Sequence, residues 1–277
     1  MRLATLRIDG STRAAVKVND DFALLDASDV AALLRSPDWE TLVEQASLRG
    51  SLVPAASADF APLVTSAGKI ICCGLNYRDH IQETGRETPE FPTLFGKFND
   101  TLTGAYDEIH LPPESEKVDW EAELVVVVGT RLQNATPVEA VQAIAGYSIA
   151  NDISMRDWQQ RTVQWLQGKV FTATTPVGPE MVTADEFSPL LPHGISTEVN
   201  GKVAQNSKTD QLIFTCADLL AYISKFTVLS PGDIVLTGTP GGVGMAATPP
   251  QYLQNGDVLV TSIDGIGFQR NLFTNAV

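Results

Sequence analysis

Short blocks of apolar residues, separated by turns that contain Gly or Pro, make up most of the chain. Apolar or β-branched runs with the length and composition of strands occur at 124–129, 146–152, 233–244 and 257–267. Apolar residues with helical spacing are rarer, and they predict helices at 79–85, 137–145 and 215–226. The pattern therefore predicts an α+β fold that is rich in β-strands.

The first 65 residues have a different arrangement. Alternating runs at 3–9, 14–20 and 21–27 predict a short meander of strands, and helical spacing follows at 29–36 and 39–50. Pro54, Pro62 and the Ala and Ser residues around them predict a linker that ends before Lys69. We therefore expect a small N-terminal α+β domain at 1–65 and a larger β-rich domain at 69–277.

Composition narrows the class of protein. Of 277 residues, 44% are hydrophobic and 19% are charged, which is typical of a globular protein. The net charge of -14 argues against nucleic acid as a partner, because no basic patch is available to bind phosphates. The chain shows neither a signal-peptide pattern nor the roughly 20 apolar residues that a membrane span needs. We therefore expect a cytoplasmic protein with no membrane partner.

The cysteines indicate neither a disulfide framework nor a zinc site. Cys72 and Cys73 are adjacent, so on a strand their side chains would point to opposite faces, and Cys216 is distant in sequence. We expect three buried free thiols.

Two carboxylates stand at the start of the most apolar predicted strand. Side chains alternate between the faces of a strand, so Glu121 and Glu123 project to the same side. Two like charges near a low-dielectric sheet are costly unless a proton, a basic side chain or a cation compensates them. A solvated strand end is the alternative that this segment leaves open.

A third carboxylate follows the predicted strand at 146–152. Asp152 could join Glu121 and Glu123, and three carboxylates with waters suit Mg²⁺ or Mn²⁺. No cluster of His or Cys suggests zinc. The alternative is that Asn151 and Asp152 form only an Asx-type turn.

Two further segments are candidates for chemistry. His80 and Glu83 are three residues apart on a predicted helix, so they share a face, and a carboxylate beside an imidazole suits a general base that activates water. A surface ion pair is the alternative. The Gly-rich segment 231–244 lacks the phosphate-loop pattern, and it predicts either a tight turn or a pocket floor with Thr239.

In their order along the chain, these segments resemble the fumarylacetoacetate hydrolase family. The motifs are GLNYRDHIQE, PTLFGKF with TLTG, DWEAELVVVVG, AGYSIANDISMRD, VNGKVAQ, PGDIVLTGTPGGVG and NGDVLVTSIDGIG, within residues 69–273. The resemblance implies a mixed β-sandwich roll as the catalytic domain, preceded by a small N-terminal domain. Because family members are usually homodimers, we expect a homodimer.

The resemblance also implies roles for nine side chains. The ligands of one Mg²⁺ or Mn²⁺ would be Glu121, Glu123 and Asp152. The catalytic side chains would be His80, Glu83 and Lys169, with the first two on a lid. Substrate contacts would come from Arg156, Gln159 and Thr239. Lys97 is a weaker match, and we assign it no catalytic role.

The implied substrate is a small 2-oxo acid. Our leading hypothesis is hydrolysis of the C–C bond in a short 2,4-dioxo acid such as an acylpyruvate or a fumarylpyruvate-like acid. His80 and Glu83 would activate water, and Lys169 would stabilise a metal-bound enolate. The same enolate would form in decarboxylation of oxaloacetate, or in isomerisation or decarboxylation of hydroxy-diene-dioates in aromatic catabolism. A scaffold that only binds ligands is the non-enzymatic alternative, and the intact residue set argues against it.

Overall fold

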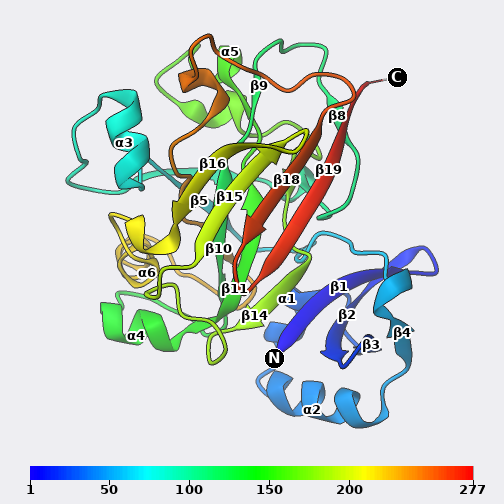
Figure 1. Cartoon of the computed structure of the whole chain (residues 1–277). Helices are drawn as coiled ribbons and strands as arrows, with labels where there is room; N and C mark the ends of the chain where they lie inside the picture. The colour runs from blue at the N-terminus through cyan, green and yellow to red at the C-terminus, as the bar shows by residue number, and fades with distance from the viewer. Residues whose placement is uncertain (277) are drawn as a thin grey trace.

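The computed structural model describes residues 1–276 (Figure 1). One ten-stranded sheet contains strands from both sides of the predicted domain boundary. Its strands, in spatial order, are β4 (Leu52–Pro54), β3 (Asp21–Leu24), β2 (Ser11–Val18), β1 (Arg2–Ile8), β14 (Glu180–Thr183), β11 (Ile144–Asn151), β10 (Ala122–Val128), β17 (Ile234–Leu236), β5 (Ile70–Gly74) and β6 (Thr93–Lys97). The sheet is mostly antiparallel, but β17 and β5 pair in parallel.

A second sheet of five strands lies over the β10–β11 pair (Figure 1). Its strands are β16 (Lys202–Lys208), β15 (Gly194–Val199), β18 (Val258–Ile263), β19 (Gly267–Asn275) and β8 (Ile109–Leu111). Two short pairs join β12 (Ser154–Met155) to β9 (Val118–Asp119) and β13 (Thr175–Pro176) to β7 (Leu102–Thr103). Two packed sheets with peripheral helices confirm the predicted strand-rich α+β class.

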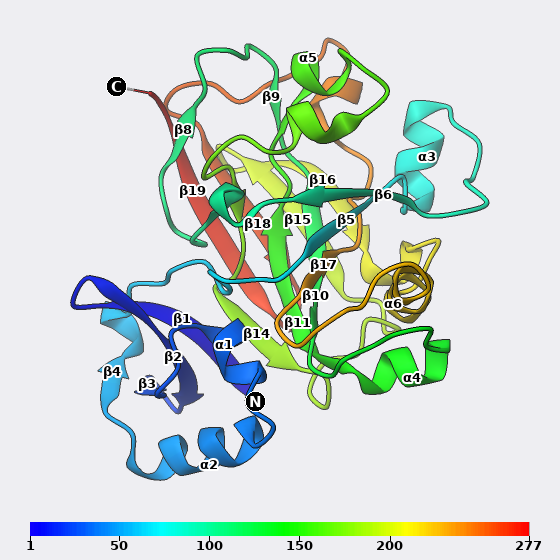
Figure 2. The same cartoon turned by 180° about the vertical axis from the view of Figure 1, so that it is seen from behind.

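The α-helices lie outside the sheets (Figures 1 and 2). Within residues 1–276 they are α1 (Val30–Leu34), α2 (Trp39–Arg49), α3 (Arg78–Thr84), α4 (Pro137–Gln142), α5 (Arg156–Gln159) and α6 (Cys216–Ser224). None of them is long and apolar enough to span a membrane. The helix predicted at 137–145 is too long: it ends at Gln142, because Ile144 already pairs with Val128 on β10.

Strand β10 forms the centre of the hydrophobic core. All seven of its residues are buried, as expected for a β-branched run that has a strand on each side and a layer on each face. Leu124 and Val126 contact the cluster that includes α6 and the second sheet. Val125 and Val127 contact the cluster that includes α1 and β1. Cys72, which belongs to the second cluster, is like Cys73 and Cys216 a buried free thiol, as predicted.

The predicted linker is a packed part of the fold. Ala61 and Leu63 are fully buried, and their backbone N–H groups donate to the carbonyls of Thr5 on β1 and of Val177. In addition, β1 pairs directly with β14, so the N-terminal strands extend the central sheet. The segment predicted as a linker is therefore packed against the fold, and the domain boundary between residues 65 and 69 stays a prediction.

A buried carboxylate fixes α1 to this connecting segment. Asp29 caps α1 by accepting a hydrogen bond from the Ala32 N–H at 2.6 Å. Its second oxygen accepts from the Thr65 N–H at 2.6 Å, the Thr65 hydroxyl at 2.7 Å and the Ser66 hydroxyl at 3.0 Å. Burial would raise the pKa of Asp29, but these hydrogen bonds outweigh it and lower the pKa.

We expect Asp29→Asn to lower the free energy of unfolding by about 1–3 kcal/mol at pH 7, because buried donors lose their acceptor. The native pKa lies below the unfolded one, so this stabilisation is present above the unfolded pKa and is lost as pH falls through the native pKa. The difference in the free energy of unfolding between wild type and Asp29→Asn, measured by urea unfolding, should therefore narrow at acidic pH. Asp26 is exposed, so the control variant Asp26→Asn should have the same free energy of unfolding as wild type at each pH.

Candidate active site

A cavity of about 220 Å³ lies beside the end of β5 and the start of β10. Seven of the nine predicted site residues line it: His80, Glu121, Glu123, Arg156, Gln159, Lys169 and Thr239. The other two, Glu83 and Asp152, each contact a lining residue. The structure thus brings the nine residues together from six separate parts of the chain. It does not test their roles.

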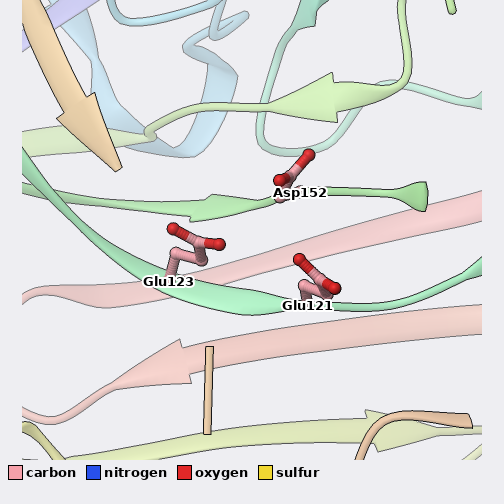
Figure 3. Close-up of side chains that lie close together, drawn as sticks. All are labelled: Glu121, Glu123 and Asp152. Atoms are coloured by element: carbon pink, nitrogen blue, oxygen red, sulfur yellow. The ribbon is translucent and has the colours of Figure 1, made fainter. Parts of the chain in front are cut away.

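The carboxylate trio comes from two neighbouring strands. Glu121 and Glu123 flank Ala122 at the start of β10, and Ala122 pairs with Asn151 at the end of β11. The Asp152 N–H donates to the Glu121 carbonyl at 2.8 Å, which places the third carboxylate beside the first two (Figure 3). One oxygen from each of the three buried side chains lies within 4.8 Å of the others.

Two buried lysines neutralise part of this negative charge. The Lys169 ammonium lies 2.6 Å from Glu121 and 2.9 Å from Asp152. The Lys97 ammonium lies 2.7 Å from the other oxygen of Asp152 and also donates to the Lys169 carbonyl. Lys97 therefore belongs to the site's charge network, although its sequence match alone assigned it no role.

The two glutamates have opposite electrostatic environments. Burial alone would raise the pKa of Glu121, but Lys169 and Arg156 outweigh burial and lower this pKa to about 2. Burial, reinforced by Asp152 and Glu121, raises the pKa of Glu123 well above its ordinary value. Glu123 is therefore the carboxylate of the trio whose charge the surrounding protein compensates least.

This arrangement fits a hard divalent cation. The donor set consists of carboxylate oxygens only, which suits Mg²⁺ or Mn²⁺ better than zinc. Among the described contacts, Glu123 accepts one hydrogen bond, from the Gly238 N–H at 2.7 Å, and forms no ion pair within residues 1–276. A cation between the three side chains would supply the missing charge.

His80 reaches the cavity from α3. Its Nδ1 lies 3.3 Å from Oε2 of Glu83, on the next turn of the same helix, and its ring is nearly buried. The other oxygen of Glu83 accepts from the Gly242 N–H at 2.9 Å. The carboxylate thus orients the imidazole, and the second ring nitrogen remains for a substrate or water.

Arg156 is held on two sides and free on a third. Its Nε donates to Asp119 at 2.8 Å, and its Nη1 lies 2.7 Å from Glu121 and donates to Gln159 at 2.9 Å. Its Nη2 is buried and has no hydrogen-bond partner within residues 1–276. A buried unpaired N–H group next to a cavity indicates a position for an oxygen of a ligand.

Asp119 and Gln205 support the site, and the sequence analysis gave neither of them a role. Besides Arg156, Asp119 accepts from the backbone N–H groups of Gly244 and Met245, so it ties the Gly-rich turn to α5. Gln205 accepts from the Ala122 N–H at 3.0 Å and donates to the Thr239 hydroxyl at 2.8 Å. The i, i+2, i+4 acidic spacing of Asp119 with the two glutamates could have revealed Asp119.

The match to a known protein family covers the region that contains the site. Residues 69–274 match the family described as fumarylacetoacetate (FAA) hydrolase C-terminal. The chain belongs to the fumarylacetoacetate hydrolase family. It is 45% identical over 219 residues to the mitochondrial oxaloacetate tautomerase Fahd2a of Rattus norvegicus, which covers 78% of this chain and 69% of that protein.

Two solved structures of the family match the whole chain. The fumarylacetoacetate hydrolase of Exiguobacterium antarcticum has a TM-score of 0.90 at 30% identity, and all of both chains is covered. The 5-carboxymethyl-2-hydroxymuconate delta-isomerase of Mycobacterium smegmatis has a TM-score of 0.82 at 28% identity, also over the full length of both chains. The recognised family and its fold are thus confirmed, and the chain is an enzyme of this family.

Proposed function

We propose that this enzyme interconverts the keto and enol forms of oxaloacetate, with Mg²⁺ or Mn²⁺ held by Glu121, Glu123 and Asp152. The observation that carries the proposal is that one small cavity joins Glu121 and Glu123, with Asp152 beside them, to His80 and to the cationic side chains of Arg156 and Lys169. The chain is also 45% identical to an oxaloacetate tautomerase. At about 220 Å³, the cavity is below the usual size for drug-like ligands, which favours a small acid.

The side chains support a proton transfer between C3 and the C2 oxygen. His80 would take the proton from C3 and return it to oxygen, so one C–H bond breaks, one O–H bond forms and no atom is lost. Lys169 has three donors and uses two of them on Glu121 and Asp152, which leaves one for the oxygen where negative charge develops. The bound cation would add Lewis acidity and charge neutralisation.

Hydrolysis of the C–C bond of an acylpyruvate is the second candidate. The 3.3 Å contact between His80 and Glu83 favours it, because an imidazole oriented by a carboxylate can activate water. Both reactions require the same cation and the same cationic side chains, so the substrate distinguishes them rather than the site.

One set of assays tests both candidates. The keto–enol relaxation of oxaloacetate is followed by absorbance, and pyruvate release is followed from oxaloacetate and from acetylpyruvate, each with Mg²⁺, with chelator and without enzyme. We expect faster relaxation that requires Mg²⁺ and no pyruvate above the blank. Metal-dependent pyruvate from acetylpyruvate would instead establish the hydrolase, and pyruvate from oxaloacetate alone would establish a decarboxylase.

A further inference from the structure

The carboxylate of Asp79 connects α3 to two other parts of the molecule. Its Oδ2 accepts from the Ser207 hydroxyl on β16 at 2.6 Å. Its Oδ1 accepts from the Gly241 N–H at 3.2 Å and from the N–H of its neighbour His80 at 2.8 Å. Asp79 does not line the cavity. Its contacts therefore bear on the site through the position of α3.

Glu83 makes a similar contact one turn later. Because Asp79 and Glu83 are four residues apart, they lie on the same face of α3. They accept hydrogen bonds from the consecutive N–H groups of Gly241 and Gly242. The Gly-rich turn thus receives both carboxylates, and charged acceptors make such hydrogen bonds stronger than neutral ones.

Besides these carboxylate contacts, Arg78 of α3 donates to the Leu212 carbonyl at 3.3 Å, and the N-cap residue Tyr77 is fully buried. The helix has only seven residues, and a helix of that length does not form stably without tertiary contacts. It lies at the edge of the molecule, outside both sheets (Figures 1 and 2). Its buried residues are His80 and Ile81. The contacts of Asp79 and Glu83 therefore add to those that hold the helix and, through it, the His80 ring.

We propose that Asp79 is a positioning residue that, with Ser207, fastens α3 in the orientation in which His80 faces the carboxylate trio. The hydrogen bond from Ser207 to Asp79 helps to hold α3 in place, so that Glu83 is not the only side chain of its face that does so. Oε2 of Glu83 then stays directed at the imidazole. The role of His80 in proton transfer rests on the proposed function, but the fastening of α3 does not depend on which reaction the enzyme catalyses.

The test compares the full-length variants Ser207→Ala, Asp79→Ala and Asp79→Asn with wild type. Hydrogen–deuterium exchange is measured for the backbone of α3, kcat and KM are measured with oxaloacetate, and Mn²⁺ affinity is measured by electron paramagnetic resonance. The matched control is Ser196→Ala on the neighbouring strand β15, because no hydrogen bond of the Ser196 hydroxyl is present within residues 1–276.

For Ser207→Ala and Asp79→Ala we expect faster exchange in α3 and a kcat reduced about tenfold, since a charge-assisted hydrogen bond is lost. KM and Mn²⁺ affinity should stay within about twofold of wild type, because neither residue contacts the cavity. Asp79→Asn should retain most of kcat, since its amide can accept from the backbone and donate to Ser207. Ser196→Ala should match wild type throughout.

Unchanged exchange in both alanine variants would overturn the proposed fastening. Faster exchange with an unchanged kcat would overturn the positioning role. If the wild-type enzyme left oxaloacetate unchanged but cleaved acetylpyruvate, only the proposed reaction would be contradicted, and the same loss of kcat is then expected with acetylpyruvate. Thermal unfolding shows whether each variant is folded. If an Asp79 variant is not, the result for Ser207→Ala, the least disruptive change, decides whether the proposal holds.

Discussion

Replacement of Glu123 by Gln is expected to abolish turnover and to weaken Mn²⁺ or Mg²⁺ binding by about 100-fold or more. Substitution of a residue that only hydrogen-bonds a metal ligand typically lowers metal affinity roughly 10–100-fold, and loss of a ligand should cost more. Glu123 lacks an ion-pair partner within residues 1–276, and its pKa is raised by burial and by the neighbouring Asp152 and Glu121. Its charge is therefore useful mainly to a bound cation. Titration calorimetry with Mg²⁺ and electron paramagnetic resonance with Mn²⁺ measure the loss directly.

The same substitution should leave the protein as stable as wild type or more stable. A neutral amide of the same size removes the repulsion among three buried carboxylates, and its oxygen can still accept from the Gly238 N–H. Glu180→Gln is the matched control, since Glu180 is a nearly buried carboxylate with Arg2 and Lys17 as partners. It should lose stability and retain metal affinity. A Glu123→Gln variant that binds Mn²⁺ like wild type would contradict the assignment of the metal ligands.

Local patterns were sufficient for the strands that carry the site. The run 124–128 is β-branched and apolar enough to predict a buried strand, and two-residue alternation placed Glu121 and Glu123 on one face. Helix starts were equally local: Thr136 and Thr215 each form a capping box with the acidic residue three positions later. The predicted end of α4 was wrong because Ile144 pairs with Val128 on β10, a contact between strands that helical spacing does not encode.

Residues with ordinary local sequence were the hardest to predict. The segment around Ala61 and Leu63 has a linker's composition, yet it is buried and its backbone donates to Thr5 and Val177, which are far away in sequence. Lys97 ends β6 and Gln205 lies within β16. Their roles arise from contacts 55 and 83 residues away in sequence, with Asp152 and Ala122. No periodicity encodes such contacts, because they form only when the strands assemble into the sheets.

A His80→Ala variant is expected to lose about 10²–10⁴-fold in kcat, the range over which a positioned general base accelerates a reaction. The imidazole is the one histidine ring that lines the cavity, and Glu83 orients it from 3.3 Å away. Metal affinity should be unchanged, because the trio keeps all of its contacts with Lys97 and Lys169. The two variants therefore differ in one measurement: His80→Ala should lose kcat and keep metal affinity, whereas Glu123→Gln should lose both.

The chain provides its own control for this experiment. It contains three histidines, and His110 is exposed on β8, where its ring contacts Thr274. His110→Ala should therefore leave kcat unchanged. Added imidazole should restore part of the activity of His80→Ala, since the truncation enlarges an open cavity beside the substrate, whereas it should not restore Glu123→Gln. Full activity of His80→Ala on oxaloacetate and on acetylpyruvate would remove the histidine from both candidate mechanisms.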